Sequence, residues 1–502
     1  MAKYLIGLDN GGTKIKCAVF DLSGNEMGVG SSALALHTPF EGWTERDGEE
    51  VWKANVKAIK EAILNAGVGT KDIIGVGLTG YGNGACLVDK NGETVYPCIV
   101  STDSRASEYL ARWEQDGTMK AVYDLTYQKI WDAQPAALLA WFRDNKPEIL
   151  DKAAYVLDIK DYIRHRLTGN ICGEITAASS GCLMNIKTLE YDRKIFEILG
   201  IEKYYGITPP YVKSTDVSGC VTKEAAKITG IPEGTPVSGG YFDIDAGAFA
   251  SGVLDEETLC LIAGTWSINE YITKDLESGY GKFSNTVGYL PGWYVVEDSS
   301  PTSASNLEWF LDRFLIEEKA RYKEKLYDIC NEKVESILPE DTDIVFVPYL
   351  YASATNPKSK GMFLGLSGYH RREHLIRAVY EGVAFSTAFH VERLIKGRNV
   401  QYKTARFSGG VSRSPVWAQM VCDILQIPIE ILKSSELSAM GAAMSAGIAC
   451  GVFSDQEDAV EKMVKISHRY EPCAEKAAVY QRKFSNYKRA LEFLDKYYDE
   501  CK

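Results

Sequence analysis

The chain has 502 residues, of which 45% are hydrophobic and 25% charged, as in an ordinary globular protein. A chain of this length forms more than one hydrophobic core, so we predict two domains. The formal net charge is −12 and no block of like charge interrupts the sequence. An acidic surface repels nucleic acids and anionic membranes, so we expect neither as a partner.

The twelve cysteines are scattered from Cys17 to Cys501 without a CxxC pair, so zinc and thioredoxin-like sites have no support. We expect them to be reduced thiols of a cytoplasmic protein. The sequence begins with a strand-like segment at Tyr4 and shows no signal-peptide core. No apolar stretch approaches the ~20 residues of a membrane span. The six histidines show no metal-ligand spacing.

The first part of the chain reads as strands, one helix and a helical region. In chain order we expect strands at Tyr4–Leu8 and Ile15–Phe20, a turn at 21–25 into a third strand, a helix at Glu49–Ala66, a buried strand at Ile73–Leu78, a hairpin of Ala85–Val88 with Thr94–Tyr96, and mainly helices over 104–170.

Val237–Gly240 reads as the end of the last strand of the first part. From Thr258 the order strand, Gly-Thr turn, strand repeats the order at the start of the chain. We place the boundary near 245–256, which gives domains 1–250 and 251–502. Helices are expected at Ala246–Ala250, 373–395, 414–426, 438–452 and 474–498.

The turn from Asp9 to Lys14 is a candidate phosphate site. Gly11 and Gly12 let backbone N–H groups gather around an anion, and the Thr13 hydroxyl adds a donor. Asp9, at the end of the strand, could orient a magnesium ion through water. An ordinary hairpin turn could have the same composition.

Two other nucleotide motifs are excluded. GVGLTG at 75–80 fits GxGxxG, but the chain continues into another turn and hairpin, whereas a dinucleotide site needs a helix there. No GxxxxGK[ST] occurs, so the chain has no P-loop.

Two segments of the second part could also contact a nucleotide. Gly264 and Thr265 form a turn between two strands. The run from Gly409 to Ser414 follows a strand and precedes a helix, where N–H groups are available to an anion. Simple tight turns would look the same.

Asp243 is a candidate catalytic base because it lies near the expected domain junction, where ligands usually bind. A carboxylate can accept the proton of an attacking hydroxyl group. Asp245 is a rival for this role. Either residue could instead cap a helix, a position that aspartate favours.

Polar residues at strand ends could hold a sugar. Asn83 follows the strand at Ile73–Leu78, and Asp103 and Arg105 follow Ile99–Ser101. Ordinary surface loops have similar composition. Four tryptophans at helical spacing are predicted to be core residues, namely Trp52, Trp113, Trp141 and Trp309.

Taken together, these motifs resemble the FGGY carbohydrate kinase family over nearly the whole chain. GGVSRSPVWAQMVCDILQIPIE at 409–430 resembles the long C-terminal motif of the family, and PAALLAWFRDN at 135–145 resembles a shorter one, with Leu138 where the family usually has Lys. IKDYIRHRLTG at 159–169 is also typical. The resemblance implies a two-domain α/β fold of the actin/hexokinase-like ATPase (ribonuclease H-like) class, with a cleft between the domains.

Within the family the chain is most similar to the L-xylulose/3-keto-L-gulonate kinase branch. SPTSASNLEWF at 300–310, FVPYLYAS at 346–353, IVSTDSRA and Leu138 carry this similarity. Gly82 beside Asn83 departs from glycerol kinases, which have an Arg-Glu pair there, and from D-xylulose kinases, which have Met-His. The expected reaction is transfer of phosphate from ATP to a terminal hydroxyl of a small ketose or keto sugar acid.

The resemblance also implies roles for single residues. Asp243 matches the catalytic base, and Asn83 and Asp103 match positions that hold the sugar. The first phosphate turn is Asp9 to Lys14, with magnesium near Asp9, and the second contains Gly264 and Thr265. Positions that contact the nucleotide are matched by Ala304, Glu308, Gly409, Gly410 and Ser414.

Several alternatives remain open. Other substrates within the family are D-xylulose, further pentuloses, glycerol and erythritol. An acidic sugar would need a cationic partner, for which Arg105 and Lys160 are candidates. From other classes, an actin-fold ATPase that acts on proteins and a non-catalytic sugar sensor would keep some of these motifs. Family analogy makes a homodimer an expectation.

Overall fold

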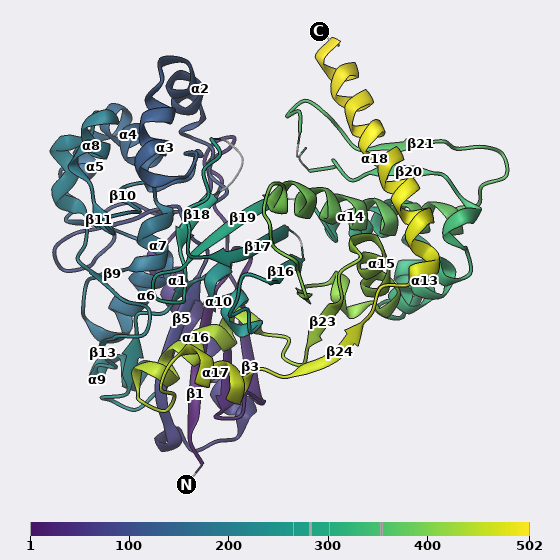
Figure 1. Cartoon of the computed structure of the whole chain (residues 1–502). Coiled ribbons are helices and arrows are strands. Elements are labelled where there is room, and N and C mark those ends of the chain that lie inside the picture. Colours follow the sequence, from purple (N-terminus) through teal and green to yellow (C-terminus); the bar gives the residue numbers. More distant parts are fainter. Residues whose placement is uncertain are drawn as a thin grey trace. The chain divides into compact units, whose positions relative to one another are not determined.

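The computed structural model describes residues 2–264, 266–280, 284–300, 302–351, 353 and 355–500. The chain forms two compact units (Figure 1). The first unit extends to Leu254 and also contains Ile272–Val296 and Ser434–Lys465. The second contains Asp255–Tyr271, Glu297–Lys433 and the chain from Ile466 onward. Two later segments therefore group with the N-terminal part of the chain.

A mixed sheet forms the centre of the first unit, in the order β13-β14-β5-β1-β2-β3. β1 runs antiparallel to β2 and parallel to β5, and β15 also pairs with β5. The predicted strands on both sides of the glycine turn, and the buried strand after it, are confirmed. The strands of this sheet are β1 (Tyr4–Asn10), β2 (Lys14–Asp21), β3 (Glu26–Ala33), β5 (Ile73–Gly80), β13 (Val217–Cys220), β14 (Pro236–Ser238) and β15 (Tyr241–Phe242).

Helices pack against this sheet and bury its central strands. α1 (Gly48–Ala66) packs on β2 and β3, and the Asp47 carboxylate caps it by accepting the Glu50 N–H. α16 (Leu437–Ala449) packs on β1 and β5, and α10 (Asp243–Ala250) packs on α16. Since both faces of β1 and β5 are covered, these strands are almost wholly buried.

The rest of the first unit is mainly helical and has an apolar core of its own. Trp113 and Trp141 belong to this core as predicted, Trp52 is buried in the core beneath the sheet, and Trp309 of the other unit is half-buried. The remaining helices of the first unit are α2 (Ser107–Asp116), α3 (Thr118–Thr126), α4 (Pro135–Asn145), α5 (Pro147–Leu150), α6 (Ile159–Thr168), α7 (Ile175–Ser180), α8 (Arg193–Ile198), α9 (Lys223–Thr229) and α17 (Gln456–Met463).

Short strands complete the first unit. They are β4 (Glu45–Arg46), β6 (Cys86–Val88), β7 (Cys98–Ile99), β8 (Tyr155–Leu157), β9 (Gly173–Glu174), β10 (Met184–Asn185), β11 (Glu190–Tyr191), β12 (Tyr211–Val212) and β18 (Ser284–Val287). The predicted hairpin with Thr94–Tyr96 is present but short. Val88 and Thr94 form an antiparallel bridge, and the N–H groups of Asp89 and Val95 donate to the carbonyls of Glu93 and Leu87. The regular ladder of β6 is formed with β8.

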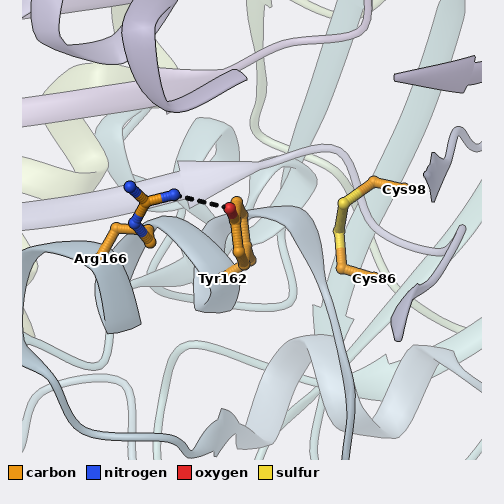
Figure 2. Close-up of a disulfide and its surroundings, with 4 residues drawn as sticks. All are labelled: Cys86, Cys98, Tyr162 and Arg166. Atoms are coloured by element: carbon orange, nitrogen blue, oxygen red, sulfur yellow. Dashed lines mark hydrogen bonds between the residues drawn. A yellow bond between two sulfur atoms is a disulfide. The ribbon is translucent and has the colours of Figure 1, made fainter. Parts of the chain in front are cut away.

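The prediction that all cysteines are free thiols is wrong. Cys86 and Cys98 form a disulfide, with Cα atoms 4.4 Å apart (Figure 2). β6 and β7 lie side by side here, since Ala85 and Ile99 form a bridge, and this brings the two thiols together. The twelve-residue separation in sequence did not reveal this proximity. Free thiols include Cys17, Cys172, Cys182, Cys220, Cys330, Cys422, Cys450 and Cys473.

The second unit repeats the strand arrangement of the first. β16 runs antiparallel to β17 and parallel to β22, as β1 does to β2 and β5. β23 and β24 follow in the order β17-β16-β22-β23-β24. The strands assigned wholly or partly to this unit are β16 (Thr258–Ala263), β17 (Ser267–Thr273), β19 (Tyr294–Ser300), β20 (Val345–Val347), β21 (Met362–Leu364), β22 (Thr404–Ser408), β23 (Ile429–Leu432) and β24 (Ile466–Tyr470).

The helices of the second unit include the long α14, which is buried along most of its length. They are α11 (Ser305–Phe314), α12 (Ile316–Tyr322), α13 (Lys325–Glu335), α14 (Arg372–Ile395), α15 (Pro415–Leu425) and α18 (Ala474–Glu500). The helices predicted in this part are confirmed to within a few residues. Among the described residues, none of the helices combines the length and apolarity that a bilayer crossing requires.

Candidate active site

The glycine turn closes the hairpin of β1 and β2, whose pairing ends with Asn10 opposite Ile15. Arg46 of β4 is buried against this turn, and its guanidinium donates to the carbonyl oxygens of Gly11 and Gly12. In a trans peptide the N–H points opposite to the carbonyl. The N–H groups of Gly12 and Thr13 therefore point away from Arg46, at residues that are exposed. This arrangement leaves amide donors available to an anion.

Asp9 lies at the end of β1, opposite Lys16 in the β1–β2 ladder. Burial raises the pKa of the Asp9 carboxyl to about 7, and the nearby Lys16 only partly offsets this effect. Lys16 itself forms an ion pair of 2.6 Å with Glu436. Within the described ranges no cluster of three metal-ligating side chains exists. A carboxylate such as that of Asp9 is of the ligand type that could bind magnesium through water.

Asp243 and Asp245 differ clearly in exposure. Asp243 is the first residue of α10 and keeps part of its surface exposed. Phe242 occupies the N-cap position, so the capping interpretation of Asp243 is wrong. Asp245, one of the most buried polar residues, has no exposed surface. Of the two carboxylates, only that of Asp243 is accessible to a dissolved substrate.

Asn83 lies in the loop after β5 with a left-handed backbone, φ +68°. Its side chain is buried, and Oδ1 has no hydrogen-bond partner within the part of the chain that the structure describes. A buried amide oxygen normally has a partner, so Asn83 is suited to accept a ligand hydroxyl. Beside it, a Cβ at Gly82 would lie 2.3 Å from the ring of Phe242. The loop thus packs directly on the residue before Asp243.

Asp103 and Arg105 form a closed buried pair. The Asp103 carboxylate accepts from the Arg105 Nε at 2.8 Å, the Arg105 Nη2 at 2.8 Å and two backbone N–H groups, those of Arg105 and Thr44. Arg105 also donates to Glu45 and stacks 4.1 Å from the centroid of the Trp43 ring. Both side chains are wholly buried. Their charges neutralise each other and leave no free cation here.

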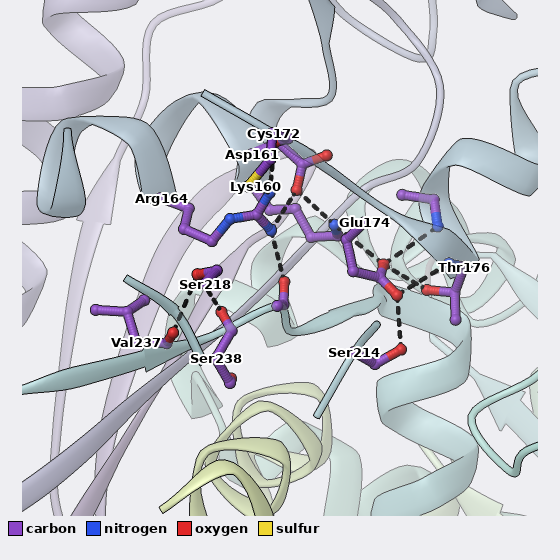
Figure 3. Close-up of polar contacts among 12 residues, drawn as sticks. Lys160, Asp161, Arg164, Cys172, Glu174, Thr176, Ser214, Ser218, Val237 and Ser238 are labelled. Carbon is purple, nitrogen blue, oxygen red and sulfur yellow. Dashed lines mark hydrogen bonds and ion pairs between the residues drawn. The ribbon is translucent and has the colours of Figure 1, made fainter. Parts of the chain in front are cut away.

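Lys160 is likewise buried and paired. It lies 2.7 Å from Asp161 and 3.2 Å from Glu174, and Arg164 pairs with the same Asp161 (Figure 3). These four side chains form what we call the buried charge cluster, which is held between α6 and α7. Lys160 is therefore unsuited to bind an acidic substrate.

The structure brings together four predicted nucleotide positions of the second unit. The Ala304 N–H donates to the Gly264 carbonyl at 3.0 Å, and a Cβ at Gly410 would lie 3.8 Å from that of Ala304. Gly409 has φ +92°, and a Cβ there would approach the Ala263 carbonyl to 2.5 Å. Only glycine fits this contact. Thr265 lies outside the described residues.

Ser414 and Glu308 are engaged in local contacts. Ser414 caps α15 by accepting the Trp417 N–H, and its hydroxyl donates to Asn331 Oδ1 at 2.7 Å. The exposed Glu308 carboxylate pairs with Lys319 at 3.1 Å. Both side chains thus have local partners within the second unit.

Sequence reasoning missed two residues that shape the candidate site, Arg46 and Phe242. Arg46 lies 34 residues from the turn that it contacts, so no local pattern indicates the contact. Phe242 reads as an ordinary apolar residue, although its position directly before Asp243 was a usable signal.

Two family models match the chain. The N-terminal domain of the FGGY family of carbohydrate kinases matches residues 4–250, and the C-terminal domain matches residues 259–450. The chain belongs to the FGGY family of carbohydrate kinases. As an FGGY kinase it is an ATP-dependent enzyme that phosphorylates a small sugar, and its fold is the two-domain α/β fold of actin and hexokinase.

Relatives of this FGGY kinase match over their full length. The L-xylulose/3-keto-L-gulonate kinase of Escherichia coli (strain K12) is 34% identical over 100% of this chain and 99% of its own. A probable L-xylulose kinase of Pasteurella multocida (strain Pm70) is 32% identical over 98% of this chain and 99% of its own. The crystal structure of xylulose kinase from Rhodospirillum rubrum is 26% identical in sequence and has a TM-score of 0.87. The match covers 99% of this chain and 100% of that chain.

Proposed function

We propose that this FGGY kinase transfers the γ-phosphoryl group of ATP to a terminal hydroxyl of a neutral open-chain ketose such as L-xylulose, with Asp243 as the base. The observation that carries the base assignment is the difference in exposure between Asp243 and Asp245. The substrate class is supported by the full-length similarity to kinases named for L-xylulose.

The preference for a neutral sugar follows from the pairing of the two candidate cations. Arg105 is neutralised by Asp103 and Glu45, and Lys160 lies in the buried charge cluster. A carboxylate on the sugar would lose its hydration without gaining a partner from either residue. We therefore rank L-xylulose above 3-keto-L-gulonate, and we keep D-xylulose, glycerol and erythritol as alternatives.

In the proposed mechanism, Asp243 accepts the proton of the attacking hydroxyl while the protein positions the phosphates. Phosphoryl transfer passes through a loose transition state, so catalysis consists mainly of positioning and charge stabilisation. Asn83 accepts a sugar hydroxyl. Asp103 has all its acceptor positions occupied, so we assign it a supporting role in the loop after β7 rather than a direct contact with the sugar.

The phosphates are assigned to the two turns. N–H groups of Gly11, Gly12 and Thr13 and the Lys14 side chain contact one face of the polyphosphate, and Gly264 and Thr265 are assigned to the same ATP. Magnesium would screen the phosphate charge, held by ATP and, through water, by Asp9. The adenosine end is assigned to Ala304, Glu308, Gly409, Gly410 and Ser414. The domains 1–250 and 251–502, a homodimeric state and a cytoplasmic location stay predictions.

The base assignment is tested by Asp243→Asn. A positioned base contributes ~10²–10⁴-fold in rate, so kcat should fall by about that factor while ATP binding, measured by calorimetry, is retained. Asp455→Asn is the matched control, because Asp455 also begins a helix, capping α17 by accepting the Asp458 N–H. It should leave kcat unchanged. Near-normal turnover of the Asp243 variant would overturn the assignment.

The substrate is tested by ADP release with L-xylulose, 3-keto-L-gulonate, D-xylulose, glycerol and erythritol. We expect the highest kcat/KM for L-xylulose. A higher kcat/KM for 3-keto-L-gulonate would contradict the argument from paired cations, and a higher value for D-xylulose, glycerol or erythritol would replace L-xylulose by that sugar.

A further inference from the structure

A single hydrogen bond ties the residue before Asp243 to another helix. The backbone N–H of Phe242 donates to the hydroxyl oxygen of Thr176 in α7, at 2.9 Å, and both residues are buried. N–H groups at the start of a helix have no partner inside the helix, so a side chain has to supply one. Here the partner comes from 66 residues away in sequence.

The Thr176 hydroxyl is itself oriented. It donates to Glu174 Oε2 at 2.8 Å, and since a hydroxyl has only one proton, its lone pairs are left to accept the Phe242 N–H. Glu174 is fully buried and also accepts from the Thr176 N–H, at 2.9 Å, and from the Ser214 hydroxyl, at 2.6 Å (Figure 3). Lys160 of the buried charge cluster balances its charge. These contacts therefore hold the Glu174 carboxylate in one orientation.

The segment leading to Phe242, residues 239–241, is held by the same group of buried polar side chains. Arg164 of the buried charge cluster donates to the Gly239 carbonyl at 2.7 Å. The Gly240 N–H donates to the Ser214 carbonyl at 2.9 Å. Contacts at Gly239, Gly240 and Phe242 thus fix this segment, and their partners are Arg164 of the buried charge cluster and two residues that hydrogen-bond to Glu174, Ser214 and Thr176. This concentration of buried polar groups lies immediately before the proposed base.

We infer that Thr176, oriented by Glu174, is a positioning residue that sets the place of the Asp243 carboxylate relative to the sugar hydroxyl. The inference rests on the base role proposed for Asp243. A displacement of about 1 Å in a catalytic group can cost ~10²-fold in rate. Loss of the Thr176 hydroxyl would let the start of α10 shift, while the nucleotide residues of the second unit are untouched.

Thr176→Val tests this inference because it keeps the shape of the side chain and removes the hydroxyl. We expect kcat to fall by ~10–100-fold and the KM for ATP to change less than about twofold. Thr176→Ser keeps the hydroxyl, so its kcat should stay within about threefold of the wild type. If Thr176→Val does not fold, Thr176→Cys replaces it, with a weaker acceptor and an expected fall of at least about threefold.

Thr229→Val is the matched control. Thr229 is also fully buried, and its hydroxyl donates to Ala225 and accepts the Ile231 N–H. This variant should lower Tm about as much as Thr176→Val and leave kcat unchanged. An equal fall of kcat in both valine variants would show a merely structural effect and overturn the inference.

A double-mutant cycle separates this inference from the proposed function. If Thr176 acts through Asp243, Thr176→Val should change the residual rate of Asp243→Asn less than about twofold. A further fall of tenfold or more would overturn the inference, as would a normal kcat of folded Thr176→Val. Failure of the base assignment is seen separately, as high activity of Asp243→Asn alone.

Discussion

Asp9→Asn should stabilise the protein while impairing its reaction. Burial raises the pKa of Asp9 from 3.8 to about 7, so at pH 8 the folded protein holds an ionised carboxylate in an unfavourable place. A difference of about three pKa units corresponds to ~4 kcal/mol at 1.36 kcal/mol per unit. Because part of the residue remains exposed, solvent screening reduces this value, and we expect ~1–3 kcal/mol.

The pH dependence of stability gives the sign of the difference between Asp9→Asn and the wild type. Between about pH 4 and pH 7 folded Asp9 keeps its proton and unfolded Asp9 loses it, so this residue lowers the stability of the wild type as pH rises through that range. Asparagine does not titrate. The difference in Tm between Asp9→Asn and wild type should therefore be smallest near pH 4 and reach ~2–8 °C above pH 7, measured by calorimetry without nucleotide.

Asp21→Asn is the control with the opposite sign. Burial raises the pKa of Asp21, but hydrogen bonds from Asn25 and the Ser23 N–H outweigh this and lower it, so the variant should be destabilised at pH 8. Asp9→Asn should also need ~10–100-fold more magnesium for half-maximal activity, as for a lost outer partner of a metal. A Tm difference for Asp9→Asn that is negative, or that does not change with pH, would refute this reasoning.

Two further predictions concern the surroundings of the site. Arg46→Met removes both donors to the turn carbonyls, a loss of ~1–3 kcal/mol. The KM for ATP should therefore rise by about tenfold or more in steady-state assays. An unchanged KM would exclude a role of Arg46 in positioning the turn. Cys98→Ser opens the loop closed by the Cys86–Cys98 disulfide and should cost ~3 kcal/mol of stability, so a reductant should lower the Tm of the wild type to that of the variant. Peptide mapping without reductant that finds both thiols free would contradict the disulfide.

The strands around the glycine turn could be predicted because their signals are local. Alternating and continuous apolar runs, with the turn residues between them, appear within twenty residues of sequence. The same holds for the helix at 474–498, whose periodicity extends over several turns. The order of the motifs could likewise be compared with a family without knowledge of contacts.

Contacts between distant segments could not be predicted in this way. Arg105 showed its charge in the sequence but not its partner Glu45, which lies 60 residues earlier. The pairing of β6 with β8, which lies far along the chain, was likewise not visible in the sequence. The exposure of Asp243 and the burial of Asp245 depend on how α10 packs on α16, which local periodicity does not reveal.

With the roles proposed for Asn83 and Asp243, the contact between Gly82 and the ring of Phe242 would couple sugar choice to catalysis. Any side chain at position 82 would collide with that ring, and the ring belongs to the residue that precedes the base. A basic residue at position 82, as in glycerol kinases, would therefore displace the proposed base Asp243 unless position 242 became smaller at the same time. Substrate preference in this enzyme should therefore evolve through paired changes at 82 and 242, with the change to a smaller residue at 242 coming first.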